Sequence, residues 1–316
     1  MAGSLGWRGY CRIGTSGDVL PLTGARLAEN IDIIPSNSIH GGGVGTIDGR
    51  FASQHNYAIG QAQYNGELSG EVFAGTGSYA DAFFAILNRA MGSAPTDNSL
   101  RDDGFDSTTQ LVLSPGGGSE WLFPSSSGAS AAKAVVSNMN LSARVGGNVE
   151  FSASIVSAGA DFNASASNAP AVTDFAYEPG GTTDDSNPLP YYSSAFTVTG
   201  SGETNMSERI TSWNITINNN SVPIFTFDGN NYASDVLQGI MEVTGSFTYY
   251  SPDGTFVRNL THGASATITF GSTTINMPHM AFGPYPVPMP GVNSPTEREV
   301  TFRCVASSSY PSIYLS

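Results

Sequence analysis

The sequence predicts a mainly β protein of two tandem β-sandwich or barrel-like units, with one helix in the first unit. Charged residues make up only 12% of the 316 residues, about half the share of an ordinary soluble domain. Gly, Ser, Thr and Asn are abundant instead. Apolar and polar residues alternate in one short segment after another, which is the pattern of half-buried strands. This composition favours short strands and many turns over long amphipathic helices.

Strands of the first half stand out by their alternation. In residues 66–74 (GELSGEVFA), Leu68 and Val72 fall on one face, and two glutamates fall on the other. Residues 138–145 alternate in the same way and are followed by Gly146 and a second glycine. A Gly-Gly pair between two alternating segments predicts a β-hairpin.

A helix is expected at residues 79–91. Ser78 is a suitable N-cap, Asp81 lies in the first turn, and Gly92 is a typical stop. Apolar residues recur at helical spacing, so one face of the helix should pack on a sheet: Tyr79, Phe83, Ile86 and Ala90.

Later strands are expected within residues 212–217, 240–250, 265–270 and 298–306. Between the halves, residues 168–190 have turn composition throughout. We therefore place the border between the two predicted units there, with residues 1–170 in the first unit and 171–316 in the second.

Two short segments echo each other across that border. SNMNLS (137–142) matches TSWNIT (211–216) in residue kind, and GNVEFSAS (147–154) matches GIMEVTGS (239–246). Repeated supersecondary units are a sign of duplication. Chance similarity among strands rich in Ser, Thr and Asn is the alternative.

Charge and cysteine content exclude several classes. The net charge is −14 with no run of Lys or Arg, so the basic footprint of a nucleic-acid binder is missing. Cys11 and Cys304 cannot form a disulfide framework, and Cys304 falls on the apolar face of its strand, as a buried thiol would. No apolar run approaches the length of a membrane span, and the N-terminus lacks the apolar region of a secretion signal. We expect a chain that is made in a cytoplasm and has no membrane partner.

Reaction chemistry is not indicated. The four histidines lack the spacing of a metal pair, and GTGSYA (75–80) follows an alternating strand instead of the continuous apolar strand that a dinucleotide site requires. Acidic pairs at 102–103 and 184–185 lack the spacing of a calcium loop and are more typical of solvated loops. We predict no catalytic residue, no cofactor and no metal site, and hence no enzyme.

The second half resembles a known family through three ordered segments. They are RITSWNITINNNSVPIFTFDG, then GIMEVTGSFTYYSPDG, and finally the proline-rich stretch that ends in TEREVTFRCVA. This order is similar to that of the tail tube proteins of long-tailed bacteriophages and covers about Arg209 to Ala306. The first half is similar more loosely, through GELSGEV before a helix and through the Gly-Gly hairpin.

The resemblance implies two tail-tube-type units, a fold shared with phage and type VI secretion tubes, and no enzyme activity. It implies a virion protein of the phage tail that is assembled in the host cytoplasm. Subunits would close into rings that stack around a bore, through which DNA passes without specific binding. Further partners would be the tape-measure protein and other tail proteins. If both halves carry the tube unit, three chains make a pseudo-sixfold ring; if only the second does, six chains are needed.

Two sets of residues are the candidate sites. The first set lies in an insertion and is expected to make subunit or ring contacts: Asn218, Val222, Pro223, Phe225, Phe227 and Tyr232. The apolar residues among them suggest a partner surface, although they could also pack on their own domain. The second consists of polar strand residues expected to line the bore, unless they form plain outer surface: Glu150, Ser152, Glu242 and Thr244.

Other functions remain open from the sequence. Scattered aromatic residues such as Trp121 and Tyr191 would also suit an adhesive or carbohydrate-binding β-sandwich module. A tail terminator or hub protein would share the resemblance but form single rings.

Overall fold

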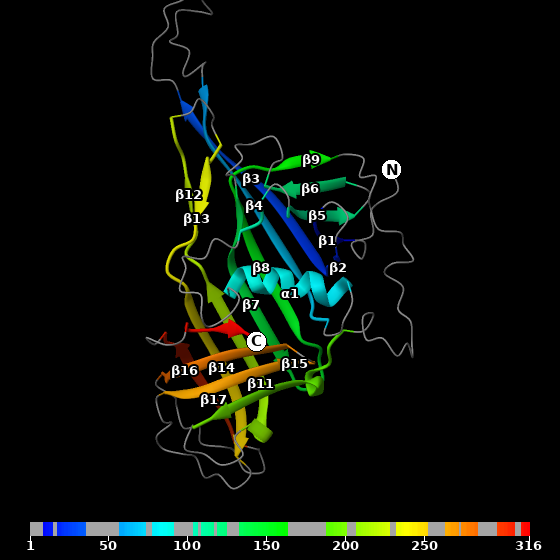
Figure 1. Ribbon diagram of the computed structural model, residues 1–316, viewed down its shortest axis with the longest axis vertical. Helices are drawn as coiled ribbons and strands as arrows, with labels where there is room; N and C mark the ends of the chain where they lie inside the picture. The colour runs from blue at the N-terminus through cyan, green and yellow to red at the C-terminus, as the bar shows by residue number, and fades with distance from the viewer. Residues whose placement is uncertain are drawn as a thin grey trace, which may run out of the picture.

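A computed structural model (Figure 1) describes these residues of the chain: 9–14, 18–35, 57–73, 78–91, 104–106, 109–116, 119–124, 133–163, 188–200, 207–227, 232–251, 263–271, 273–283, 296–306 and 311–316. Within them the protein is mainly β with one α-helix, as the sequence predicts.

A large antiparallel sheet runs through both halves of the chain. Its order in space is β3 (Gly24–Pro35), β4 (Tyr57–Glu71), β8 (Glu150–Ser157), β7 (Ala134–Arg144), β11 (Ile210–Asn218), β14 (Glu242–Ser251), β17 (Thr296–Cys304), β16 (Thr273–Phe282), β15 (Ala264–Phe270) and β10 (Ser194–Thr199). The short strand β18 (Tyr314–Leu315) pairs with β16.

Smaller elements complete the fold. A five-stranded sheet has the order β2 (Val19–Pro21), β1 (Tyr10–Ile13), β5 (Leu111–Gly116), β6 (Ser119–Phe123) and β9 (Asp161–Asn163). A separate hairpin consists of β12 (Val222–Ile224) and β13 (Asp235–Leu237). Single 3-10 turns are η4 (Tyr191–Ser193) and η5 (Ser207–Arg209).

The helix α1 (Ser78–Met91) lies where the capping pattern predicts one, and packs against β7 of the large sheet and β2 of the smaller one (Figure 1). Its Phe83 is fully buried, with its ring 5.3 Å from that of Phe151 in the first half and 6.4 Å from that of Phe270 in the second. One continuous apolar core therefore connects the strands of both halves.

The order of strands in the large sheet repeats with a period of four. β3-β4-β8-β7 is followed by β11-β14-β17-β16, and in each group the strands come first, second, fourth and third along the chain. Because every neighbouring pair is antiparallel, corresponding strands of the two groups point in the same direction. β7 thus corresponds to β16, and β11 to β3.

This arrangement corrects the strand equivalence suggested by the sequence echo. The echoing segments form β7 and β11, which are adjacent and antiparallel, with Leu141 opposite Ile215. Adjacent antiparallel strands run in opposite directions, so they cannot occupy the same place in two copies that keep their direction. The predicted border at residues 170 and 171 lies outside the described residues and stays a prediction.

Candidate bore and assembly surfaces

One face of the large sheet is polar from strand to strand. Residues that are directly opposite each other on neighbouring strands point to the same side, so a row of facing partners can be followed across the sheet: Ser69, Ser152, Asn140, Thr216, Thr244 and Arg303. The intervening residues of the same strands are buried in the core, for example Leu141 and Ile215. Polar and apolar residues alternate because one side of the sheet faces water and the other faces the core.

Hydrogen bonds and ion pairs join side chains across this polar face. Asn140 donates from Nδ2 to Thr216 Oγ1 at 2.9 Å, and Asn214 donates from Nδ2 to Asn140 Oδ1 at 3.3 Å. Arg303 forms an ion pair with Glu242, and both side chains are more than 40% exposed. Exposed ion pairs of this kind contribute little to stability, but each neutralises one positive charge of the face.

Acidic side chains predominate on the polar face. Within the described strands they are Glu67, Glu71, Glu150, Glu242, Glu297 and Glu299. The basic side chains on the same face are Arg26, Arg144 and Arg303. Arg26 and Arg303 are each paired with a glutamate, so the face as a whole is negative.

The four predicted bore residues all lie on this face. Glu150, Ser152 and Thr244 are exposed, and Glu242 is half-buried. The sequence did not single out their neighbours Asn140, Asn214 and Glu299. Alternation in GELSGEVFA placed Glu67 on a polar face, but no local signal shows that this strand joins the same sheet.

The residues predicted for subunit contacts fall in two places. Asn218 lies in β11 on the polar face, opposite Glu242. The others lie on or beside the β12–β13 hairpin, which extends alongside β3 and β4 (Figure 1). Phe227 is fully exposed, and Val222 and Tyr232 are exposed to 56% and 43%. Together these apolar side chains form an exposed surface at the hairpin.

Other hairpin residues pack on the protein's own body. Phe225 contacts a small buried cluster that includes Val135, Ala158 and Val236, and Pro223 is the strand partner of Val236. The ring of Tyr232 also lies 5.7 Å from that of Tyr64 on β4. The base of the hairpin is therefore fixed to the body of the protein, and Phe227 projects from it into solvent.

The run of three asparagines after β11 has a structural role that the sequence did not reveal. Asn219 is buried, and its Nδ2 donates to Ala90 O at the end of α1 and to Val136 O on β7, at 3.0 and 2.8 Å. Asn220 adopts a positive φ of 46°, which Asn tolerates better than most residues. The asparagines thus connect the helix to the sheet and turn the chain toward the hairpin.

Buried ionisable groups serve structure. Arg12 Nη2 lies 2.9 Å from Glu120 Oε1, with both side chains almost fully buried, and the Tyr10 hydroxyl also donates to Glu120. Burial, and then Glu120, raise the pKa of Tyr10 above its usual value. Burial also raises the pKa of the Cys11 thiol and raises that of Cys304 to about 12. Such thiols are unreactive, and Cys304 is buried as the alternation predicts.

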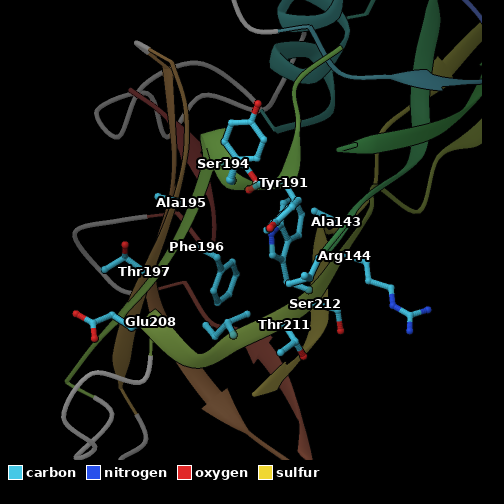
Figure 2. Close-up of a pocket in the computed structure, with 14 residues that line it drawn as sticks. Ala143, Arg144, Tyr191, Ser194, Ala195, Phe196, Thr197, Glu208, Thr211 and Ser212 are labelled. Carbon is cyan, nitrogen blue, oxygen red and sulfur yellow. The ribbon is translucent and has the colours of Figure 1, made fainter. Parts of the chain in front are cut away.

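A groove of about 290 Å³ lies beside the β7–β11 junction, between β10, β11 and η4 (Figure 2). Phe196 and Trp213 stack in it with ring centroids 6.0 Å apart. Figure 2 shows the charged ends of Arg144 and Glu208 directed away from Phe196. The residues that line the groove include no His and no Cys, and Ser194 Oγ donates to a backbone oxygen. The groove is lined by an aromatic contact between β10 and β11.

Among the described residues, no group of three or more His, Cys, Asp or Glu could hold a metal ion. Of these same residues, no helix is long and apolar enough to cross a membrane. His279 is described, whereas the acidic pairs at 102–103 and 184–185 and the other histidines lie outside the described residues.

Residues 14–306 match the family of phage tail tube proteins. The chain belongs to that family. Membership places the protein in the virion, in the phage tail, with a structural role, and it extends the resemblance seen in the second half over nearly the whole chain. No curated protein matches the sequence. The mainly β fold that the tail tube resemblance implies is confirmed.

Proposed function

We propose that this tail tube protein assembles into rings, that the rings stack, and that the polar face of the large sheet lines the bore for DNA ejection. The observation that supports this proposal is the polar face itself: one continuous surface, acidic in net charge, backed by an apolar core. A sheet that presents one polar face to water and buries the other is suited to line a channel.

Charge on the face suits passage without binding. Phosphate binding requires unpaired Lys or Arg, and two of the three arginines on the face are paired with glutamates. Like charge on the wall and on DNA prevents adhesion. DNA and the tape-measure protein would therefore pass without being held, and the role is non-enzymatic.

For the ring we favour three chains over six. Each chain contributes two groups of four strands that keep their direction, which is the relation that rotation about a tube axis requires. Three chains would close a barrel of about 24 strands, more than the 16–18 strands that leave an aqueous channel in porins. With a strand spacing of about 4.8 Å and a tilt of about 40°, the backbone diameter would be roughly 48 Å.

Ring stacking is assigned to the β12–β13 hairpin, whose exposed Val222 and Phe227 would contact the next ring or other tail proteins. Apolar side chains that are grouped at the surface are typical of partner sites. Negative-stain microscopy of the purified protein should show hollow filaments. Phe227→Ser should leave rings but shorten or abolish the filaments, whereas Tyr192→Ser, which changes another exposed aromatic residue, should leave filaments unchanged.

Other outcomes contradict the proposal in distinct ways. Monomers at high concentration would exclude self-assembly and favour an adhesive module. Single rings from the unchanged protein would indicate a terminator or hub. Filaments of normal length with Phe227→Ser would remove the hairpin from the stacking contact.

The bore assignment has its own test. Tubes that carry Glu150→Lys should retain short DNA duplexes in low-salt co-sedimentation, and unchanged tubes should not. Glu208→Lys changes the same charge at an exposed residue outside the polar face and serves as the control. Equal retention by the two variants would show that Glu150 does not face the bore.

A further inference from the structure

Phe227 is an apolar knob that its own subunit leaves in water. The side chain is fully exposed, whereas Phe225, two residues earlier, packs on the buried cluster at the base of the hairpin. Burial of an aromatic ring is among the largest gains that a single side chain can contribute to an interface. A second surface that accepts Phe227 would therefore strengthen the assembly considerably.

The aromatic groove lies at the opposite end of the strands that lead to the hairpin. Residues 210–213 of β11 line the groove, and the chain enters the hairpin after Asn218. β7 is arranged in the reverse sense, because residues 143–145 at its end line the groove and Val135 near its start packs in the same cluster as Phe225. Figure 1 shows β12 and β13 well above β11. From residue 212 to residue 218 an extended strand covers about 20 Å.

The hairpin and the groove therefore face opposite rims of the proposed ring. Strands of a barrel tilt by about 40° from its axis, so the two ends of β11 point toward different neighbouring rings. When rings stack in one orientation, the hairpin end of one ring meets the groove end of the next. A contact between two different patches of one chain is heterologous, and where it does not close it produces an open filament. A stacked tube requires this relation.

The groove has the size and the lining to receive a phenylalanine ring. Its volume is about 290 Å³, and a cavity of about 150 Å³ accommodates benzene. Phe196 and Trp213 form the stacked aromatic pair in it, and Tyr191 also lines it. Aromatic rings attract one another in offset and edge-to-face arrangements. Tyr192 stands at the rim with 76% exposure, so Tyr192→Ser leaves these walls intact.

We propose that Phe227 of one protomer inserts into the Phe196–Trp213 groove of a protomer in the adjacent ring. The inference rests on the proposed function and names the partner of the hairpin surface, which is a second copy of this chain. The charged ends of Arg144 and Glu208 are directed away from Phe196 (Figure 2), so an apolar ring enters the groove without displacing an ion. Burial of Phe227 there is the contact that holds one ring on the next.

A photoreactive residue at position 227 tests where the ring lies. Phe227→benzoylphenylalanine keeps an aromatic side chain and, under ultraviolet light, bonds to a C–H group that it contacts. Irradiated filaments of this variant should give a band of two linked chains on a denaturing gel, and peptide mass spectrometry should place the link in the peptides that contain Phe196 or Trp213. Phe162→benzoylphenylalanine replaces another exposed ring and should link to those peptides at least about tenfold less, because only atoms in contact react.

A plug in the groove tests the same contact from the other side. Ser194 and Phe196 are two residues apart on β10 and share a face, so Ser194→Trp places a large ring in the groove. Thr197→Trp is the matched control on the same strand, because Thr197 is exposed and directed away from Phe196 (Figure 2). Both variants should form rings. The protein concentration at which filaments appear should rise at least about tenfold with Ser194→Trp alone, as expected for the loss of one buried aromatic anchor.

The outcomes separate this inference from the proposed function. Filaments whose links from position 227 map to other peptides would overturn the docking of Phe227 in the groove and leave the tube role intact. Normal filaments with Ser194→Trp, or an equal loss with Thr197→Trp, would overturn it as well. Absence of rings and filaments from the unchanged protein would instead remove the proposed function. If one variant does not fold, the other decides.

Discussion

Replacement of Asn219 tests how the helix is fastened to the sheet. The side chain is 1% exposed and donates two hydrogen bonds from Nδ2, to Ala90 O in the last turn of α1 and to Val136 O on β7. Carbonyls in the last turn of a helix have no partner within the helix. Asn219→Ala removes the donor, while Ala90 O and Val136 O remain buried.

The expected cost follows from those two bonds. A neutral hydrogen bond contributes about 1 kcal/mol net, and a buried acceptor left without its partner costs about 1–3 kcal/mol. We therefore expect Asn219→Ala to lower the free energy of unfolding by about 2–4 kcal/mol. A loss of 1 kcal/mol lowers the Tm of a large domain by about 2–4 °C, so the Tm should fall by about 4–16 °C.

Thermal and urea unfolding of the unassembled protein, followed by circular dichroism, measure the effect. Asn219→Asp should destabilise at least as much, because a carboxylate cannot donate to two carbonyls. Asn276→Ala is the control, since its Nδ2 bonds Ser316 Oγ near the surface, where water can replace the partner; it should change the free energy by less than about 0.5 kcal/mol. An Asn219→Ala protein as stable as the control would refute the role of Asn219 as a tie between helix and sheet.

Three further predictions concern packing and buried charge. Gly245→Ala should cost about 1–3 kcal/mol in urea unfolding, because its Cβ would contact a backbone oxygen and a ring at 2.5 Å; Gly147→Ala, whose nearest contact is 3.5 Å, should be nearly neutral. Glu120→Ala should lower stability by about 3–5 kcal/mol, because it leaves Arg12 buried without its carboxylate, and a smaller loss would indicate that water reaches the pair. The raised pKa of Cys304, about 12 in the folded protein, predicts no alkylation at pH 8 unless the protein is unfolded. It also predicts that the contribution of Cys304 to the free energy of unfolding is complete below about pH 9 and falls as the pH rises toward 12. Rapid labelling of the folded protein would contradict the raised pKa.

Local patterns in the sequence predicted the helix and part of the strands, but not β3, β5, β6 or β16. α1 was predictable because its start, stop and apolar face are all encoded within 15 residues around Ser78–Met91. Strands such as β7 and β8 were predictable because a strand with one face in water and the other in the core has alternating polar and apolar residues. The polar side of β8, with Glu150 and Ser152, was read from the same alternation.

Partnership between strands was not predictable in this way. The echo paired β7 with β11 in residue kind, because strands rich in Ser, Thr and Asn resemble one another whatever their place in a sheet. A better signal was present in Glu67-Leu68-Ser69-Gly70 and Glu242-Val243-Thr244-Gly245, where a glycine follows three alternating residues. Its meaning depends on Phe151 and Phe302, which lie directly opposite Gly70 and Gly245 on the neighbouring strands. Because these phenylalanines are distant in sequence, the signal becomes clear only when the opposite strands are known.

Duplication changes the energetics of a ring. Each association of separate chains costs roughly 4–15 kcal/mol in lost translational and rotational freedom. In a ring of three chains that each carry two groups of strands, half of the contacts between groups lie within one chain and avoid this cost. In a ring of three chains the β7–β11 contact is therefore tethered and the contact between chains is not, so rings should open between protomers while β7 and β11 remain paired.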